Sequence, residues 1–324
     1  MSRVVKVHEY GGPEVMRIEQ QTLGEPGPGE VKLRHTAMGV NYADIGMLQG
    51  RYLIKPPLPT VVGLEGAGVV EAVGSGVTTL KKGQRVAYVS MIGAFADERL
   101  APADKLYPIP DGVDDKLAAA AILKGMTADY LLHQTYPLKA GETALIHAAA
   151  GGVGTLLCQW ARHIGATVIG TVGSDAKVAL AKANGCHHVV NYSKDDFAKT
   201  CMEVTGGKGV KVIYDSVGKD TFEGNMTAIA TRGFFVNYGL ASGPIPPLDV
   251  MRINAKSMYF NKSSLIHYLV DRASGEHMSG RVFDLIKKGV LKPGVDHVYK
   301  LDDVVKALTD VTNRKTTGSV VLVP

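Results

Sequence analysis

The stretch His147-Ala148-Ala149-Ala150-Gly151-Gly152-Val153-Gly154 decides the fold that this sequence predicts. An apolar run at 143–146 precedes it, and residues 155–162 after it carry apolar side chains at helical spacing. A strand, a tight small-residue turn and a helix suit a dinucleotide pyrophosphate, because the backbone must approach the phosphates and the helix N-terminus offers free N–H groups. The spacing is that of G-x-G-x-x-G with Ala149 in the first place. We predict a dinucleotide-binding turn whose cofactor contacts are Ala150, Gly151, Gly152 and Val153.

Strands and helices alternate in the chain that follows this turn. The pattern predicts further strands and intervening helices, with strands at 167–172, 188–192, 210–215 and 233–239 and helices at 175–184 and 195–204. Such alternation is typical of an α/β fold with a doubly wound parallel sheet of the Rossmann type.

The chain before the turn has a different texture. From residue 3 to about residue 105, short β segments are separated by Gly and Pro, which predicts a compact barrel-like β domain. Helices are predicted at 114–122, 124–133, 278–288 and 301–312, and a last strand at 318–323. We expect that strand to return to the first domain, because nothing after the sheet is large enough to fold alone.

Composition narrows the class of protein. A chain of 324 residues can form two domains with cores of their own. The net charge of +5 is spread along the chain, which fits an anionic small ligand better than nucleic acid. No apolar run reaches the length of a membrane span. The three cysteines are neither paired in spacing nor clustered, so we expect reduced thiols and a cytoplasmic location.

Several motifs together resemble one family, the zinc-free quinone oxidoreductases (the zeta-crystallin group) of the medium-chain dehydrogenase/reductase superfamily. The resemblance covers nearly the whole chain, and it is carried by the glycine-rich turn with Cys158-Gln159-Trp160-Ala161 and by the segments 10–15, 39–44, 63–68, 123–127 and 214–218.

The resemblance implies a GroES-like β domain formed by residues 1–123 with 265–324, and a Rossmann domain formed by residues 124–264. It implies NADPH as cofactor, a quinone or an α,β-unsaturated carbonyl as acceptor, and a homodimer. The alternative within enzymes is an alkenal or enone double-bond reductase. The alternative of another class is a crystallin-like or RNA-binding protein that retains NADPH, against which the modest charge and few aromatic residues argue.

A catalytic zinc is not expected. Such a site needs about three protein ligands from Cys, His, Asp or Glu. In zinc-dependent relatives a Cys precedes an Asp by three residues and a His lies within Gly-His-Glu, whereas this chain has Asn41, Asp44 and Leu64 in the corresponding places. No cysteine precedes Cys158, so the four-cysteine structural lobe is also missing. We therefore expect hydride chemistry without a metal.

Asn41 and Tyr52 are the candidate catalytic residues. The Asn41 amide could donate to a carbonyl oxygen as negative charge develops on it, or it could cap its own turn. Tyr52 either lines the acceptor pocket or supplies a proton, with water as the other source. The family often has a second tyrosine where this chain has Gly46. Asn41 and Asp44 are also expected near the cofactor, Asp44 chiefly by organising the loop.

The cofactor choice depends on the end of the second Rossmann strand. An NAD site has an acidic residue there to bind the ribose 2′-OH, whereas Gly173 and Ser174 follow this strand. Lys177 and Tyr192 suit a 2′-phosphate. Asp175 is the counter-argument, since it could bind a ribose instead of stabilising a helix start. On balance these residues predict NADPH.

The remaining candidate cofactor contacts are distributed along the chain. Thr127 and Tyr130 match a family segment beside the nicotinamide, or they lie on an ordinary helix surface. Further cofactor contacts are expected after the fourth and fifth strands and later in the chain, at Ser216, Tyr238, Gly239 and Ser264. Arg314, near the C-terminus, is either another cofactor contact or a solvated cation.

Overall fold

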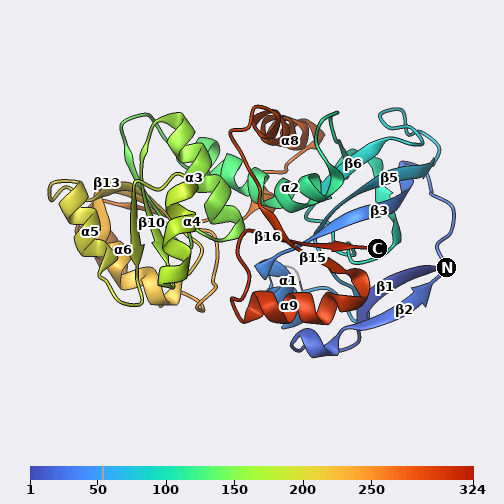
Figure 1. The fold of residues 1–324 in the computed structure, drawn as a ribbon, viewed down its shortest axis with the longest axis horizontal. Helices are drawn as coiled ribbons and strands as arrows, with labels where there is room; N and C mark the ends of the chain where they lie inside the picture. Colours follow the sequence, from blue (N-terminus) through green and yellow to red (C-terminus); the bar gives the residue numbers. More distant parts are fainter. Residues whose placement is uncertain (53–54) are drawn as a thin grey trace. The chain divides into compact units, whose positions relative to one another are not determined.

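The computed structural model describes residues 1–52 and 55–324, and they form two compact units (Figure 1). Unit 1 consists of Met1–Met126, Leu269–Lys287 and Pro293–Pro324. Unit 2 consists of Thr127–Tyr268 and Lys288–Lys292. The sequence predicts domain boundaries between residues 123 and 124 and between residues 264 and 265. In the structure the corresponding boundaries between the units fall between residues 126 and 127 and between residues 268 and 269. None of the described helices is both long enough and apolar enough to cross a membrane.

Unit 1 is built on a mainly antiparallel β structure, in which only β15 (Val295–Lys300) and β16 (Ser319–Val323) of the described strands pair in parallel. Its larger sheet has the order β15 (Val295–Lys300), β16 (Ser319–Val323), β3 (Glu30–Val40), β5 (Glu65–Val73), β6 (Arg85–Val89) and β8 (Tyr107–Pro108), and β7 (Glu98–Pro102) also pairs with β3. A smaller sheet has the order β2 (Arg17–Gln21), β1 (Ser2–Val7) and β4 (Thr60–Val61). The predicted return of the last strand is confirmed, because β16 pairs antiparallel with β3.

Unit 1 also contains helices, and the sequence predicts only some of them. The two helices predicted at 114–122 and 124–133 are one helix, α2 (Asp115–Tyr130), which belongs to unit 1 up to Met126, and a π-helical turn at Leu131–Thr135 follows it. Helices α8 (Arg272–Lys287) and α9 (Val304–Thr312) correspond to predicted segments. Helix α1 (Tyr42–Leu48) was not predicted; it buries Ile45, Met47 and Leu48 in the core of the unit.

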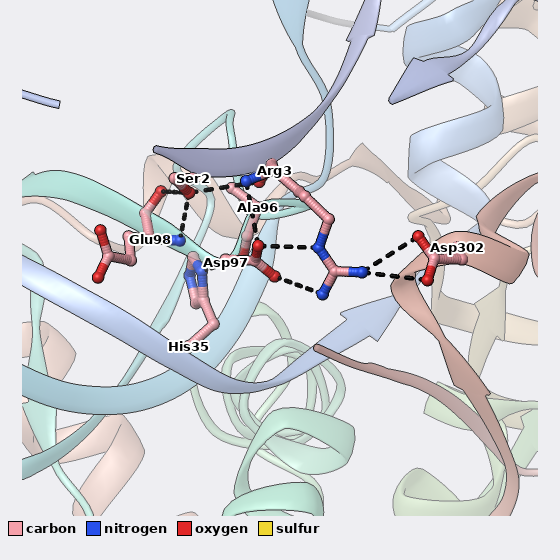
Figure 2. Close-up of polar contacts among 7 residues, drawn as sticks. All are labelled: Ser2, Arg3, His35, Ala96, Asp97, Glu98 and Asp302. Carbon is pink, nitrogen blue, oxygen red and sulfur yellow. Dashed lines mark hydrogen bonds and ion pairs between the residues drawn. The ribbon is translucent and has the colours of Figure 1, made fainter. Parts of the chain in front are cut away.

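The N-terminal strand is held by an ion-pair cluster (Figure 2). Arg3 of β1 lies between two carboxylates, with Nη2 2.9 Å from Asp97 Oδ1 and Nη1 3.1 Å from Asp302 Oδ2. Asp302 belongs to the short 3₁₀ helix Leu301–Asp303, which leads into α9. Segments from both ends of the chain are thereby joined within unit 1.

His35 of β3 lies beneath this cluster and is fully buried. Its Nδ1 donates to the carbonyl of Ala96 at 2.7 Å, so Nε2 accepts the hydroxyl proton of Tyr88 at 2.6 Å. Burial, reinforced by the charge of Arg99 and partly opposed by the Ala96 hydrogen bond and by Asp97, lowers the pKa of His35 from 6.5 to about 3. The folded protein therefore holds His35 neutral.

Acid is expected to destabilise unit 1 through His35. Because the folded pKa lies below the unfolded one, the contribution is intact above pH 6.5 and decreases as the pH falls toward 3, by up to about 1.4 kcal/mol per pH unit. Urea unfolding of wild type and His35→Gln between pH 7.5 and 5 measures this, and the variant should show the shallower dependence. A His277→Gln control at an exposed histidine of α8 should keep the wild-type slope. Equal slopes in wild type and His35→Gln would contradict the prediction.

Unit 2 contains the parallel sheet that the sequence predicts. Its order is β11 (His188–Asn191), β10 (Thr167–Val172), β9 (Thr143–Ile146), β12 (Val210–Asp215), β13 (Ile229–Asn237) and β14 (Tyr259–Lys262), with parallel pairing throughout. Its helices are α3 (Gly152–Ile164), α4 (Val178–Ala183), α5 (Phe197–Val204), α6 (Phe222–Ala228) and α7 (Val250–Asn254) (Figure 1). The predicted Rossmann architecture is confirmed, although β14 was not predicted.

The strand order places the ligand-binding edge. The chain runs outward from β9 through β10 to β11 and then returns to β12 on the other side of β9. Open parallel sheets bind ligands outside the carboxyl ends of the strands at such a reversal. The residues that follow β9 and β12 are therefore the first to consider for a site.

Candidate active site

The glycine-rich turn links β9 to α3 at this reversal. Ala148 has a positive φ of 51°, and the Ala149 N–H donates to the Thr171 carbonyl at 2.9 Å. A Cβ on Gly154 would lie only 2.1 Å from the Ala148 oxygen, so glycine is required there. Gly151 is the N-cap of α3, and Ala150, Gly152 and Val153 lie beside it. The turn thus exposes backbone where helix α3 begins, which suits a pyrophosphate.

A buried hydrogen-bond chain supports the turn. Thr171 Oγ1 lies 2.8 Å from His147 Nδ1, and His147 Nε2 lies 2.7 Å from Asn225 Oδ1. Asn225 Nδ2 donates to Asp215, so its oxygen faces the histidine and accepts from Nε2–H. Burial lowers the pKa of His147, which agrees with a neutral ring that accepts from Thr171 at Nδ1. The ends of β9, β10 and β12 are thereby tied together.

The residues predicted to bind a 2′-phosphate lie after β10 and β11. Gly173 is exposed, and a Cβ on it would lie 3.5 Å from the hydroxyl of Tyr192. Ser174 accepts the N–H of Lys177 at its carbonyl, and Lys177 is the N-cap of α4. These four residues occupy the carboxyl edge of the sheet, as the prediction requires.

Asp175 is engaged by neighbouring side chains. Asn191 Nδ2 donates to its Oδ1 at 2.7 Å, and Lys194 forms an ion pair with its Oδ2. Both contacts lower the pKa of Asp175, the lysine contact being the larger cause. The carboxylate that argued for NAD is therefore occupied by donors of this chain.

The next strand ends carry the expected small residues. A Cβ on Gly239 would lie 2.5 Å from the Ser216 carbonyl oxygen, and Tyr238 donates its N–H to the Asp215 carbonyl at 2.8 Å. Burial raises the pKa of Tyr238. Ser264, after β14, is the N-cap of the 3₁₀ helix Leu265–His267. All of these residues follow carboxyl ends of the same sheet.

Thr127 and Tyr130 of α2 are buried, so they do not form an ordinary helix surface. The Tyr130 ring stacks on Tyr268, with centroids 4.2 Å apart and an interplanar angle of 17°. The Tyr268 hydroxyl lies 2.9 Å from Thr135 Oγ1. Tyr268 was not identified from the sequence, because its contacts with Tyr130 and Thr135 join residues far apart in the chain.

In unit 1, Asn41 lies directly after β3 as the N-cap of α1. Its backbone N–H donates to Asp44 Oδ2 at 2.7 Å, and its side-chain Nδ2 donates to Glu65 Oε1 at 2.8 Å. Lys124 Nζ donates to the same oxygen of Glu65 at 2.6 Å. The structure thus surrounds the predicted catalytic amide with a buried ionic cluster.

Asp44 and Tyr52 also belong to this part of unit 1. Asp44 is fully buried, and burial is the main cause that raises its pKa to about 8. Tyr52 is half-buried against the apolar core, and burial and then the charge of Asp44 raise its pKa. The phenol is therefore protonated at neutral pH, but it is a weaker acid than a free tyrosine.

Arg314 is exposed in the turn after α9, with a positive φ of 57°. It lies in unit 1, apart along the chain from the other predicted cofactor contacts. Its role stays a prediction.

Glu65, Asn191 and Lys194 have no assigned role in the sequence-based prediction. Glu65 was visible within the motif Gly63-Leu64-Glu65, but its partners are 24 and 59 residues away in the chain. The sequence did contain one signal for Glu65. An acidic side chain within an apolar strand is rarely buried without partners, so its presence there indicates a buried polar contact.

The two positions that hold zinc ligands in zinc-dependent relatives are used differently here. Leu64 is 2% exposed and packs in the core of unit 1, and the Asn41 amide binds Glu65. In residues 1–52 and 55–324, no three His, Cys, Asp or Glu side chains are grouped to hold a metal ion.

Known proteins resemble this chain over its full length. Residues 27–111 match the family described as alcohol dehydrogenase GroES-like domain, and residues 152–288 match the family described as zinc-binding dehydrogenase. A 2-haloacrylate reductase of Burkholderia sp is 44% identical, over 98% of each chain. A quinone oxidoreductase of Pseudomonas aeruginosa is 42% identical, over 100% of each chain.

The solved structures agree with these matches. The crystal structure of Escherichia coli quinone oxidoreductase complexed with NADPH superimposes with a TM-score of 0.96, at 39% identity and over 100% of each chain. Identities above 30% across the whole chain show common family membership. The resemblance drawn from the motifs is confirmed, and the chain belongs to the quinone oxidoreductase family of the medium-chain dehydrogenase/reductase superfamily.

Proposed function

We propose that this protein reduces quinones, or related α,β-unsaturated carbonyl compounds, with NADPH and without a metal. The observation that carries the proposal is the turn at residues 148–154, which has no room for a side chain at Gly154 and leads directly into α3. A quinone oxidoreductase 39% identical to this chain has been solved with NADPH. When bound, NADPH supplies a hydride, and the protein supplies orientation and stabilises developing charge.

The residues after β10 and β11 support NADPH rather than NADH. Lys177 and Tyr192 offer a cation and a hydroxyl for a 2′-phosphate, and Ser174 offers a second hydroxyl. Asp175 already accepts from Asn191 and Lys194, so its carboxylate is not set aside for a ribose.

Reversing the charge of Lys177 is expected to weaken NADPH binding. A Lys177→Glu variant should raise the Kd for NADPH by about tenfold or more and leave that for NADH nearly unchanged, because only NADPH carries the 2′-phosphate. Fluorescence titration of both nucleotides measures this. Lys182→Glu, at an exposed lysine of the same helix, is the matched control. An unchanged NADPH affinity in Lys177→Glu would refute the assignment.

On the acceptor side, the Asn41 amide donates to the carbonyl oxygen that gains negative charge. The proton that completes the reduction comes from Tyr52 or from water. Tyr52 suits this role because its phenol is half-buried and packs against the core of unit 1, and its raised pKa, which makes it a weak acid, leaves water as the other source.

The proposal is tested by NADPH oxidation with 1,4-naphthoquinone and with a 2-alkenal. We expect turnover with at least one acceptor and identify the product by mass spectrometry. Tight NADPH binding without turnover of either compound would overturn the proposed activity. A salt-dependent gel shift with RNA in its place would favour the nucleic-acid alternative.

Reduction of an activated C=C bond is the second candidate. A relative 44% identical to this chain is named 2-haloacrylate reductase, and the same residues of this chain would serve that reaction. Faster turnover of 2-chloroacrylate than of the naphthoquinone would favour this candidate.

We also propose that the protein forms a homodimer and resides in the cytoplasm. Strand β14 is the last in its sheet, and its Tyr259 is half exposed, while Val250 and Met251 of α7 are 70% and 67% exposed. The free edge of β14 and the exposed apolar side chains of α7 are features that suit pairing with a second copy. The free thiols of Cys158, Cys186 and Cys201 suit a reducing compartment.

Replacing two apolar side chains near this edge is expected to separate the dimer. Val250→Asp with Met251→Asp should shift the mass measured by light scattering from two chains to one, because charged groups resist burial. Val270→Asp, at another highly exposed valine, is the control that should leave the mass unchanged. A wild-type mass of one chain would contradict the proposed dimer.

A further inference from the structure

The strongest unexplained feature of unit 1 is the buried carboxylate of Glu65. This residue begins β5 and is 0% exposed. Its Oε1 accepts from Asn41 Nδ2 at 2.8 Å and from Lys124 Nζ at 2.6 Å. Its Oε2 accepts from the Leu123 backbone N–H at 2.8 Å. A buried carboxylate with three donors and a buried counter-charge is fully satisfied, so its position is well defined.

The chemistry of this carboxylate determines how the Asn41 amide is turned. An ionised carboxylate accepts hydrogen bonds and cannot donate them. The nitrogen of the amide must therefore face Glu65, since the oxygen would be repelled. One N–H of Asn41 is donated to Glu65, and the second N–H of the same nitrogen then has a fixed direction. The backbone is fixed as well, because the Asn41 N–H donates to Asp44 at 2.7 Å.

The surroundings of Glu65 hold it in place. A Cβ on Gly39 would lie 2.1 Å from Glu65 Oε1 and 2.4 Å from the Ala119 carbonyl, so the carboxylate occupies the space of a missing side chain. Lys124 is 4% exposed and forms a buried ion pair with Glu65, which balances the charge of the carboxylate. Glu65 therefore has no room to change its conformation without disturbing Asn41.

From this geometry we infer that Glu65 is a positioning residue, which turns the Asn41 amide so that its second N–H is presented to the acceptor carbonyl, while the ion pair with Lys124 holds Glu65 in place. The inference depends on the proposed function, in which Asn41 donates to that carbonyl. Glu65 itself touches neither acceptor nor cofactor in this scheme. It acts through Asn41.

A Glu65→Gln substitution tests this because it preserves shape and introduces a donor. In either orientation the new amide nitrogen faces a donor, either the Leu123 N–H or the Asn41 and Lys124 nitrogens. Turning the Asn41 amide over relieves the conflict with Asn41 and moves its donor. We expect kcat with 1,4-naphthoquinone to fall by about tenfold, with little change in KM for the quinone.

A double-mutant cycle separates positioning from general damage. In an Asn41→Ala background, Glu65→Gln should cause no further loss beyond about twofold, because the residue through which it acts is missing. Glu71→Gln, on the same strand in a surface pair with Arg34, is the matched control and should leave kcat unchanged. Equal losses from Glu65→Gln in both backgrounds would overturn the inference. Absence of wild-type turnover would instead overturn the proposed function.

A spectroscopic measurement tests the amide directly, without turnover. In protein with ¹⁵N-labelled asparagine, the side-chain signals of Asn41 are those that disappear in Asn41→Ala. The amide proton donated to Glu65 should exchange slowly with solvent and lie downfield of its position in a solvent-exposed asparagine, and Glu65→Gln should speed its exchange and shift it upfield. Rapid exchange of both protons in the wild type, at the chemical shifts of a solvent-exposed asparagine, would overturn the inference even if Glu65→Gln did not fold.

Discussion

A Gly154→Ala variant is expected to lose NADPH affinity by about a hundredfold. The added Cβ would lie 2.1 Å from the Ala148 oxygen and 2.8 Å from the Ala148 carbonyl carbon, and both are backbone atoms that cannot rotate away. The turn must open, which costs about 1–3 kcal/mol and displaces the N–H groups that are proposed to bind the pyrophosphate. A loss of 2.7 kcal/mol in binding corresponds to about a hundredfold in Kd. Fluorescence titration with NADPH measures this.

The control for this substitution is another glycine within a helix. Gly280 of α8 has nothing within 4 Å of the position of a Cβ, so Gly280→Ala should fold, bind NADPH normally and gain up to about 1 kcal/mol from helix propensity. Thermal melts establish that Gly154→Ala is folded before its affinity is compared. Wild-type affinity in folded Gly154→Ala would show that the turn does not cradle the cofactor.

Unit 2 could be predicted from sequence because its signals are local. Strand β10 occupies the predicted residues 167–172, and the predicted start of the turn helix is close to that of α3 at Gly152. Strand β14 escaped prediction because Tyr259–Lys262 is mostly exposed and shows no apolar alternation. Helix α1 escaped because its seven residues interrupt a region of strands, too short for a helical period to emerge.

The residues of the candidate site likewise fall into a group that the sequence could locate and a group that it could not. Residues after strand ends, such as Gly173 and Gly239, could be located because the carboxyl ends of parallel strands share one edge. The cluster around Glu65 could not, because it combines β3, β5 and α2 through side chains with no pattern in the sequence. Likewise, the pairing of Asp175 with Lys194 depends on how β10 and β11 align.

Replacing Asn41 by alanine is expected to lower kcat/KM for the quinone by about a hundredfold. In the proposed reaction the substitution removes the donor to the oxygen that becomes negative, and the loss of one such donor costs about 10²–10³-fold in catalysis. It also leaves Glu65 Oε1 with Lys124 as its remaining side-chain donor. Steady-state kinetics with saturating NADPH measure the effect, and stopped-flow single turnovers show whether hydride transfer itself is slowed.

Stability must be separated from chemistry in this variant. Loss of a hydrogen bond to a charged group costs about 1.5–3 kcal/mol, so Asn41→Ala should melt below wild type but remain folded. Asn313→Ala, at an exposed asparagine after α9, controls for the loss of an amide elsewhere in unit 1 and should keep full activity. If folded Asn41→Ala retained kcat/KM within about threefold of wild type, the amide would not stabilise the developing charge, because a preorganised donor in a buried site is worth far more than that.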